Sequence, residues 1–172
     1  MKRDVTVRYT DSHLIHMLIN MTLEHTKSVS NRDIIADPAM PTHHTFVNRF
    51  GSLAKAKQVA KIENSFEDRD YNSILDYLAD MLRGEGHDVV RNFRVKTKDD
   101  RHDLTVPLAI VLHDQKIAID LIPENPSEPV KIVMISRADE LTSLGYVHQT
   151  YDIFSLGKNL INLVLNKPEE EN

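Results

Sequence analysis

The chain has 172 residues, 41% of them hydrophobic, with a formal net charge of −5 and no cysteine. The lack of cysteine excludes a disulfide framework and thiolate metal sites, and no apolar run reaches the roughly 18 residues that a membrane-spanning helix needs. The first residues, MKRDVTVRYTDSH, contain no apolar stretch of the kind found in secretory signals. These features predict a soluble, cytoplasmic protein with no membrane association.

Charge is distributed unevenly along the chain. Residues 1–63 hold nine Lys and Arg against six Asp and Glu, a net charge of +3, whereas residues 64–172 hold twelve against twenty, a net charge of −8. The acid-rich stretch ENSFEDRDYNS lies where the sign changes and is typical of a linker or a helix start. The sequence therefore predicts one domain over residues 1–65 and a second over residues 66–172, with different partners.

The first domain begins with two predicted helices. Apolar residues recur at helical spacing over residues 12–25, and Asp11 suits the N-cap of that helix. Ser30, with Asp33 three residues later, has the pattern of a capping box. We expect the second helix to start there and to stop before Pro38.

Two more short helices are predicted after Pro41. Thr42 is placed to cap a helix over residues 43–50, and Gly51 is placed to end it in a left-handed conformation. Ser52 is placed to cap a fourth helix over residues 53–61. Short helices joined by tight turns are typical of a helix-turn-helix domain.

The third and fourth helices combine an apolar face with a basic one. Phe46, Val47 and Phe50 share one side of the third helix, and we expect them to pack into the core. Residues 41–62 contain no carboxylate, so nothing in this stretch repels a polyanion. The side chains left outside are expected to contact double-stranded DNA, although a solvated helix face has a similar composition. They are His43, His44, Asn48, Arg49, Lys55 and Lys57, with Lys61 nearby.

The stretch DPAMPTHHTFVNRFGSLAKAKQVA resembles the homing-endonuclease-associated repeat, a small helical DNA-binding module found beside nuclease domains. The resemblance covers about fifty residues from Asp11 to Ala60. The matching positions are Pro41, Thr42, Phe46, Asn48, Arg49, Phe50, Gly51, Ser52, Ala56 and Ala60. Leu53 stands where the repeat usually has Trp, and Lys57 and Lys61 replace an apolar residue and a glycine. The resemblance implies that this unit locates a DNA site.

The second domain is predicted to have the element order α-β-β-β-α-β-α, which makes the whole chain α+β. Helices are expected in YNSILDYLADMLRGEG, from about Pro129 to Leu144, and in SLGKNLINLVLN. Strands are expected in HDVVRNFRVKT, HDLTVPLAIVLHD, QKIAIDLIP and VHQTYDI. A small sheet flanked by helices follows from this order.

Three carboxylates are candidates for a metal site. Asp76 falls on the first helix of this domain, Asp103 opens the second strand, and Asp120 lies inside the apolar run IAIDLI. A carboxylate in a buried strand is costly unless it is paired, hydrogen-bonded or bound to a cation. Two strand carboxylates and one helix carboxylate can hold Mg²⁺ against a phosphate and lower the pKa of a bound water. Alternatively, Asp120 sits at the end of the sheet and pairs with a Lys or Arg.

Residues 68–166 resemble the PD-(D/E)xK nuclease fold, closest to its very-short-patch-repair-like branch. In that family a helix carboxylate, a strand Asp and a D/E-x-K strand form the site, and these positions fall here on Asp76, Asp103 and Asp120. The stretch RADELTSLGYVHQTYDI is similar to the family's later helix and last strand. The resemblance implies a Mg²⁺-dependent DNA endonuclease with Asp103 and Asp120 as metal ligands.

This sequence departs from the nuclease pattern at one position, because Ile122 stands where the family has its lysine. Lys116, which strand alternation puts on the same face as Asp120, is the expected replacement, and Lys131 is another. Other possible general bases are His102 and His113.

Two functions follow from these patterns. The first is a Mg²⁺-dependent DNA endonuclease of homing or phage-associated type, with Asp76, Asp103, Asp120 and Lys116 in the catalytic site. The alternative is a non-enzymatic DNA-binding protein, such as a transcriptional regulator, that keeps a degenerate nuclease fold. Ile122 and the negative charge of the second domain favour the alternative. A homodimer would suit a palindromic DNA site in either case.

Overall fold

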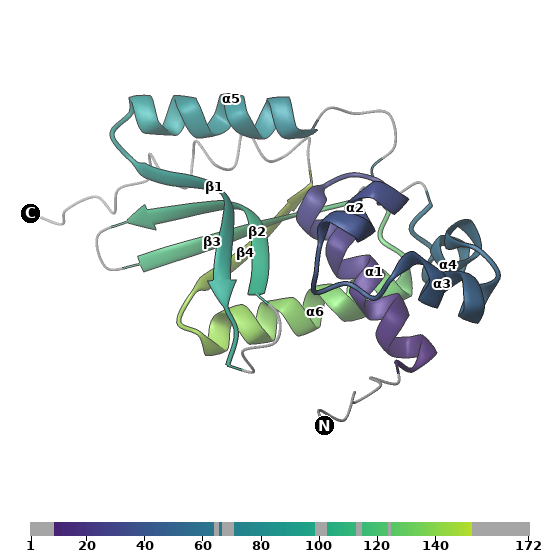
Figure 1. The fold of residues 1–172 in the computed structure, drawn as a ribbon. Helices are drawn as coiled ribbons and strands as arrows, with labels where there is room; N and C mark the ends of the chain where they lie inside the picture. Colours follow the sequence, from purple (N-terminus) through teal and green to yellow (C-terminus); the bar gives the residue numbers. More distant parts are fainter. Residues whose placement is uncertain are drawn as a thin grey trace, which may run out of the picture.

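In a computed structural model, the described part of the chain folds into six helices and one four-stranded sheet (Figure 1). The structure describes residues 9–63, 66, 71–98, 103–112, 115–123 and 125–152. The expected α+β class is confirmed, as is the order of elements from the first helix to the fourth strand. The helix expected in SLGKNLINLVLN lies outside the described residues.

The first two helices are set by side-chain caps at their N-termini. They are α1 (Asp11–His25) and α2 (Asn31–Ala36). Thr10, rather than the expected Asp11, caps α1, because the Thr10 side chain accepts a hydrogen bond from the His13 amide. Asp11 instead occupies the first turn, where a carboxylate interacts favourably with the helix dipole. The capping box of Ser30 and Asp33 is present at α2, as predicted.

A glycine turn joins the next two helices, α3 (His43–Phe50) and α4 (Leu53–Ala60). Gly51 has a φ of 85°, a left-handed conformation that only glycine adopts without strain, and its amide donates to the carbonyl of Val47. The Ser52 hydroxyl then accepts the amide of Lys55 and starts α4. Phe46 is fully buried, while Val47 and Phe50 are half-buried, so the predicted apolar face of α3 is present.

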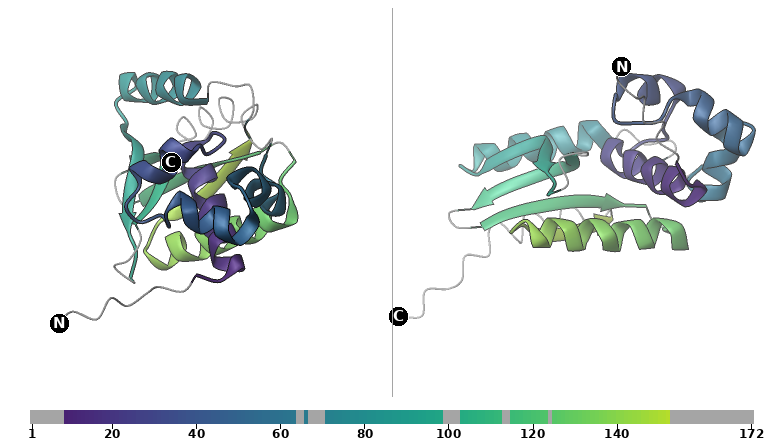
Figure 2. Two further views of the ribbon diagram at one scale, coloured as in Figure 1. Left: turned by 45° about the vertical axis from the view of Figure 1, so that its right-hand side comes forward. Right: turned by 60° about the horizontal axis from the view of Figure 1, so that its bottom comes forward.

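The sheet has the strand order β1-β2-β3-β4. Strands β1 to β3 form an antiparallel meander, and β4 pairs in parallel with β3 after a helical crossover. The elements are α5 (Tyr71–Gly84), β1 (Asp88–Lys96), β2 (Asp103–Leu112), β3 (Gln115–Ile122), α6 (Glu128–Ser143) and β4 (Val147–Asp152). Figures 1 and 2 show α5 and α6 on opposite faces of the sheet, with α1 to α4 gathered at one end of it.

Helix α5 packs on the sheet through one apolar stripe. Leu75, Leu78 and Leu82 recur at helical spacing and are buried. Ile74, which the sequence places in the same stripe, is 40% exposed because its position is rotated by 100° from that of Leu75.

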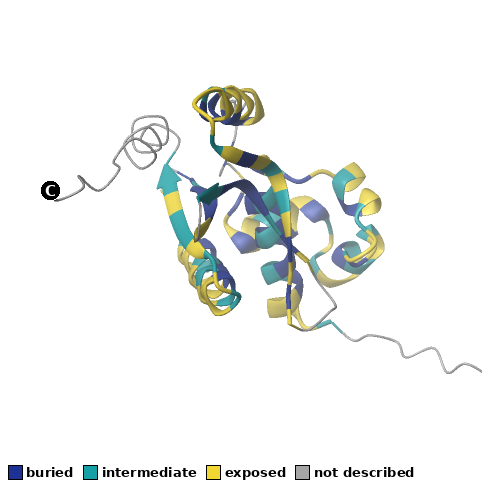
Figure 3. Cartoon of the chain, turned by 90° about the vertical axis from the view of Figure 1, so that its left-hand side faces the viewer, coloured by how far each residue is buried: buried dark blue, intermediate teal, exposed yellow. Residues whose placement is uncertain are grey.

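One continuous apolar core joins the helices α1 to α4 to the sheet. It contains Leu18 of α1, Phe46 of α3, Leu75 of α5 and Ile119 of β3, all essentially inaccessible to solvent. Figure 3 shows this core as buried segments along the sheet, with exposed residues on the outer helix faces. The division near residue 65 therefore stays a prediction. In the described part of the chain, every helix is too short or too polar to cross a membrane.

Candidate nucleic-acid interface and the buried Asp120 network

The predicted DNA-facing side chains lie on the outer surface of α3 and α4. His44, Asn48, Arg49 and Lys55 are exposed, as is the neighbouring Lys61. His43 and Lys57 are half-buried. His44 and Asn48 are each two residues from the buried Phe46 and so point to the opposite side of α3, whereas His43 and Arg49 are three residues from Phe46 and flank its side of the helix. We call this set the α3–α4 face.

Arg49 connects this face to the start of α1. Its Nε lies 2.9 Å from Oδ1 of Asp11, and its Nη2 donates to the carbonyl of Tyr9 over 3.0 Å. Both charged side chains are at least half exposed. An exposed ion pair of this kind contributes little to stability, so a phosphate group can compete with Asp11 for the guanidinium.

Lys57 has a structural contact of its own. Its Nζ donates to the hydroxyl of Ser28 over 2.9 Å and thereby ties α4 to the loop after α1. The rings of His43 and His44 meet edge to face, with centroids 5.9 Å apart. Within the described ranges, no three His, Cys, Asp or Glu side chains are arranged to hold a metal ion, at this histidine pair or elsewhere.

Asp120, the buried acid of β3, is held by two partners. The Arg137 guanidinium of α6 binds both carboxylate oxygens, with Nη2 2.8 Å from Oδ1 and Nε 3.0 Å from Oδ2. Nε2 of His148, on β4, lies 3.0 Å from Oδ2. Asp120 is 3% exposed and the Arg137 side chain 1%. The sequence left two partners open for Asp120, a metal ion or a Lys or Arg side chain, and the structure shows an arginine.

Arg137 continues the network to α1 and β2. It donates to the carbonyl of Thr105 over 2.9 Å, and its Nη1 lies 3.3 Å from Oδ1 of Asn20 and 3.4 Å from Oε1 of Glu24. Glu24 also accepts the Thr105 amide over 3.0 Å. Ladder pairing between β2 and β3 extends only to Leu108, the residue after Pro107, which has no amide proton. The Thr105 backbone groups are therefore satisfied by side chains from α1 and α6.

The charges of this network depend on one another. Burial raises the pKa of Asp120, but Arg137 and the hydrogen bond from His148 outweigh that effect, so the net pKa is lowered. Burial lowers the pKa of Arg137, but Asp120 and Glu24 raise it further than burial lowers it. For Glu24, burial dominates over Arg137 and raises the pKa. Asp120 and Arg137 thus form a buried ion pair, with Glu24 beside it.

The three carboxylates expected at a metal site make separate contacts. Asp76 is 64% exposed and pairs with Nε of Arg91 over 2.8 Å. Asp103 is exposed at the start of β2. The register of β2 and β3 places Pro107 beside Asp120, and Asp103 precedes Pro107 by four residues, roughly 13 Å along a strand. The structure therefore does not bring Asp103 next to Asp120.

The expected general bases are also dispersed. Lys116 is exposed near the start of β3, with its Nζ 6.0 Å from the centroid of the Tyr146 ring. Lys131 pairs with Glu128 on the surface of α6. The two other candidates, His102 and His113, lie outside the described residues. Neither lysine has a contact with Asp120 comparable to that of Arg137.

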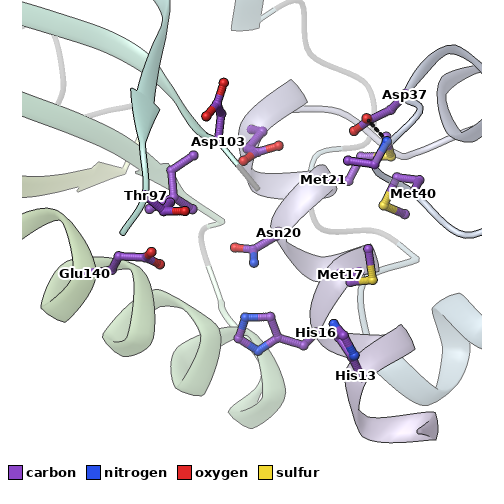
Figure 4. A pocket seen from close by; sticks show the side chains of 13 residues that line it. His13, His16, Met17, Asn20, Met21, Asp37, Met40, Thr97, Asp103 and Glu140 are labelled. Atoms are coloured by element: carbon purple, nitrogen blue, oxygen red, sulfur yellow. Dashed lines mark hydrogen bonds between the residues drawn. The ribbon is translucent and has the colours of Figure 1, made fainter. Parts of the chain in front are cut away.

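Sequence reasoning missed a pocket of about 240 Å³ between α1, the loop after α2, the β1 and β2 ends, and α6. The polar residues on its α1 side are His13, His16, Asn20 and Glu24, which are spaced three, four and four residues apart and so share one helix face. Figure 4 shows His16 and Asn20 across from Glu140 of α6. The row of polar residues in an otherwise apolar helix is the sequence feature from which this pocket could have been predicted.

In comparisons with known proteins, no family model, no curated protein and no solved structure matches the chain. The two resemblances described above therefore stay predictions made from the motifs alone.

Proposed function

We propose that this protein binds double-stranded DNA through the α3–α4 face. The observation that carries the proposal is the exposure of Asn48 and Arg49 on α3, Lys55 on α4 and Lys61 at the end of α4, while residues 38–62 contain no carboxylate. Basic and amide side chains on paired short helices contact phosphates and base edges. The buried Phe46 and the Gly51 turn hold these helices in a defined relation, so the contacts are preorganised.

We further propose that the sheet and its flanking helices do not cut DNA at Asp120. Its two oxygens are already bonded to the Arg137 guanidinium, and a Mg²⁺ ion there would face a buried positive charge. Ile122, in the position of the nuclease lysine, has no group that activates water. This arrangement supports the non-enzymatic alternative, with the α/β part as a scaffold for the DNA-binding helices.

The test is fluorescence anisotropy with duplex DNA libraries over a range of salt concentrations. The double change Lys55→Gln and Lys61→Gln is expected to weaken binding and to lower the salt slope by about 2, because two phosphate contacts are lost. Lys116→Gln with Arg94→Gln removes the same charge from exposed positions on the sheet and is the control. Equal weakening by both pairs would refute the assignment of the α3–α4 face.

A metal-dependent endonuclease is the second candidate. The observation that favours it is that Asp103, one of the expected metal ligands, lines the same pocket as three other carboxylates, Glu24, Asp37 and Glu140. Among the described residues these acids do not converge on one point as a metal site requires. Supercoiled DNA incubated with the protein and Mg²⁺ or Mn²⁺ separates the two candidates. Nicking that disappears in Asp103→Ala would establish the endonuclease, and binding without nicking would leave the scaffold proposal standing.

A further inference from the structure

We propose that the pocket between α1 and α6 is a binding site for a small organic cation, an amine or guanidine with a short alkyl body. The proposal is independent of DNA binding, because it rests on the lining of the pocket alone. The pocket holds about 240 Å³ and is lined by α1, the loop after α2, the ends of β1 and β2, and α6.

The apolar part of the lining fits an alkyl chain. Met17 and Met21 of α1, Met40 of the loop and Leu104 of β2 all line the pocket. Methionine side chains adapt to ligands of varied shape, because they are unbranched and polarisable. Figure 4 shows Met17 and Met40 on the side of the pocket that lies across from Glu140. A ligand can therefore contact the methionines with its body while its charged end lies among the polar groups.

The polar part of the lining carries negative charge. Carboxylates come from four segments, and the lining residues within the described part of the chain include no Lys or Arg: the acids are Glu24, Asp37, Asp103 and Glu140. Arg137 and the Thr105 amide already bond to Glu24, and the Ala39 amide bonds to Asp37. Asp103 and Glu140 are the carboxylates left for a ligand cation.

The His16 imidazole is compatible with a cation. Burial lowers the pKa of His16, and the charges of His13 and Arg137 lower it further. His16 is therefore neutral at pH 7 and does not repel an ammonium or guanidinium group. A neutral imidazole also offers a nitrogen that accepts a hydrogen bond from such a group.

A metal ion fits this lining less well than an organic cation. A divalent ion needs several ligands within about 2.6 Å of one point. In the described part of the chain, no such group of three acidic or histidine side chains exists. A ligand of several atoms can reach carboxylates that lie on different sides of the space, as Asp103 of β2 and Glu140 of α6 do.

The experiment is isothermal titration calorimetry of the full chain without DNA, using 1,4-diaminobutane and 4-guanidinobutylamine as probes. We expect saturable binding of at least one probe at millimolar concentration or below, and none of 1,4-butanediol, which has the same carbon chain without charge. Glu140→Gln and Asp103→Asn are each expected to weaken binding about tenfold, because each removes a charge-assisted hydrogen bond.

Asp139→Asn is the matched control, since Asp139 neighbours Glu140 on α6 but is exposed and does not line the pocket. Equal weakening by Asp139→Asn would mean that only the general negative field attracts the probe, and it would overturn the proposal. Absence of binding by both probes would do the same. Binding of Mg²⁺ alone, lost in Asp103→Asn, would replace the proposal with a metal site. Because the titration contains no DNA, a failure of the protein to bind DNA would not change the interpretation of these results.

Discussion

Arg137 satisfies more polar groups than any other side chain in the network around Asp120. It neutralises the carboxylate of Asp120 and also donates to the carbonyl of Thr105, where the β2–β3 ladder has ended. A buried charge without a partner costs much more free energy than the pair itself contributes. The role of Arg137 is therefore to make an acid in the core tolerable and to join α6 to β2 and β3.

The first prediction concerns this pair. Arg137→Met is expected to lower the free energy of unfolding by about 3–5 kcal/mol, because it removes the buried cation that neutralises Asp120 and leaves His148 as the remaining partner of the carboxylate. Urea unfolding followed by circular dichroism measures the change. Lys131→Met, on the exposed surface of the same helix, is the control and is expected to have little effect.

If Arg137→Met does not fold, Asp120→Asn with Arg137→Met tests the same idea, because the double change removes both charges. The double variant is expected to be more stable than Arg137→Met alone. A double variant that is no more stable would contradict the view that the buried carboxylate left without its arginine is the source of the loss.

The second prediction concerns the cap of α2. Partial burial raises the pKa of Asp33, but hydrogen bonds from Lys27 and Ser30 outweigh it and lower that pKa to about 2. A lowered pKa in the folded state means that the charged cap stabilises the protein above about pH 4, the unfolded value, and that this stabilisation is lost as the pH falls toward 2.

Asp33→Ala is therefore expected to cost about 1 kcal/mol at pH 7 and progressively less between pH 4 and 2. Urea unfolding of both proteins across that range measures the difference. Asp80→Ala serves as the control, because the Asp80 carboxylate is an exposed partner of Arg83 and caps no helix. A difference between wild type and Asp33→Ala that does not shrink as the pH falls would contradict the assignment.

At the scale of secondary-structure elements, the connection between α3 and α4 depends on a glycine in a left-handed conformation. Gly51 has a φ of 85°, whereas Gly84 at the end of α5 has no positive φ and no atom within 4 Å of an added Cβ. The nearest atoms to a Cβ at position 51 belong to Lys55 and lie at ordinary contact distance. Any cost of a substitution at Gly51 must therefore come from the backbone conformation.

The third prediction compares these two glycines. Gly51→Ala is expected to destabilise the protein by about 1–2 kcal/mol, because an L-residue is strained in the left-handed conformation. Gly84→Ala is expected to be neutral or slightly stabilising, since alanine favours the helix end. Thermal unfolding of both variants gives the comparison. Similar losses in both would show that the strain at Gly51 is small.

At the scale of the whole molecule, the helices α1 to α4 share both a core and a polar network with the sheet. Leu18 and Phe46 pack in the same cluster as Leu75 and Ile119, and Glu24 bonds to Arg137. Separating residues 1–65 from the rest would expose apolar surface and remove the partner of a largely buried acid. This arrangement favours one cooperative unit over two independent domains.

The fourth prediction follows from that shared core. A fragment of residues 1–65 is expected to lack a cooperative unfolding transition, because four short helices lose much of their buried apolar surface without the sheet. Circular dichroism and heteronuclear NMR of the fragment provide the measurement. A well-dispersed spectrum with a sharp thermal transition would instead support the domain boundary near residue 65.

The sequence by itself determined the elements of this protein, because their signals are local. Capping at Ser30 and Ser52, the glycine stop at Gly51 and the continuous apolar run IAIDLI each depend on residues a few positions apart. The cap of α1 was assigned one residue too late, since Thr10 and Asp11 are both good N-cap residues.

The partner of Asp120 was decided only by the tertiary structure. The sequence indicated that a carboxylate inside a buried strand needs a partner, and it left open both a metal ion and a basic side chain. The partners that the fold supplies, Arg137 and His148, lie 17 and 28 residues away on other elements. Local periodicity carries no information about which distant side chains meet, because that depends on how α6 and α1 pack against the sheet. The pocket could not be predicted from the sequence for the same reason, because the segments that line it are brought together only by the fold.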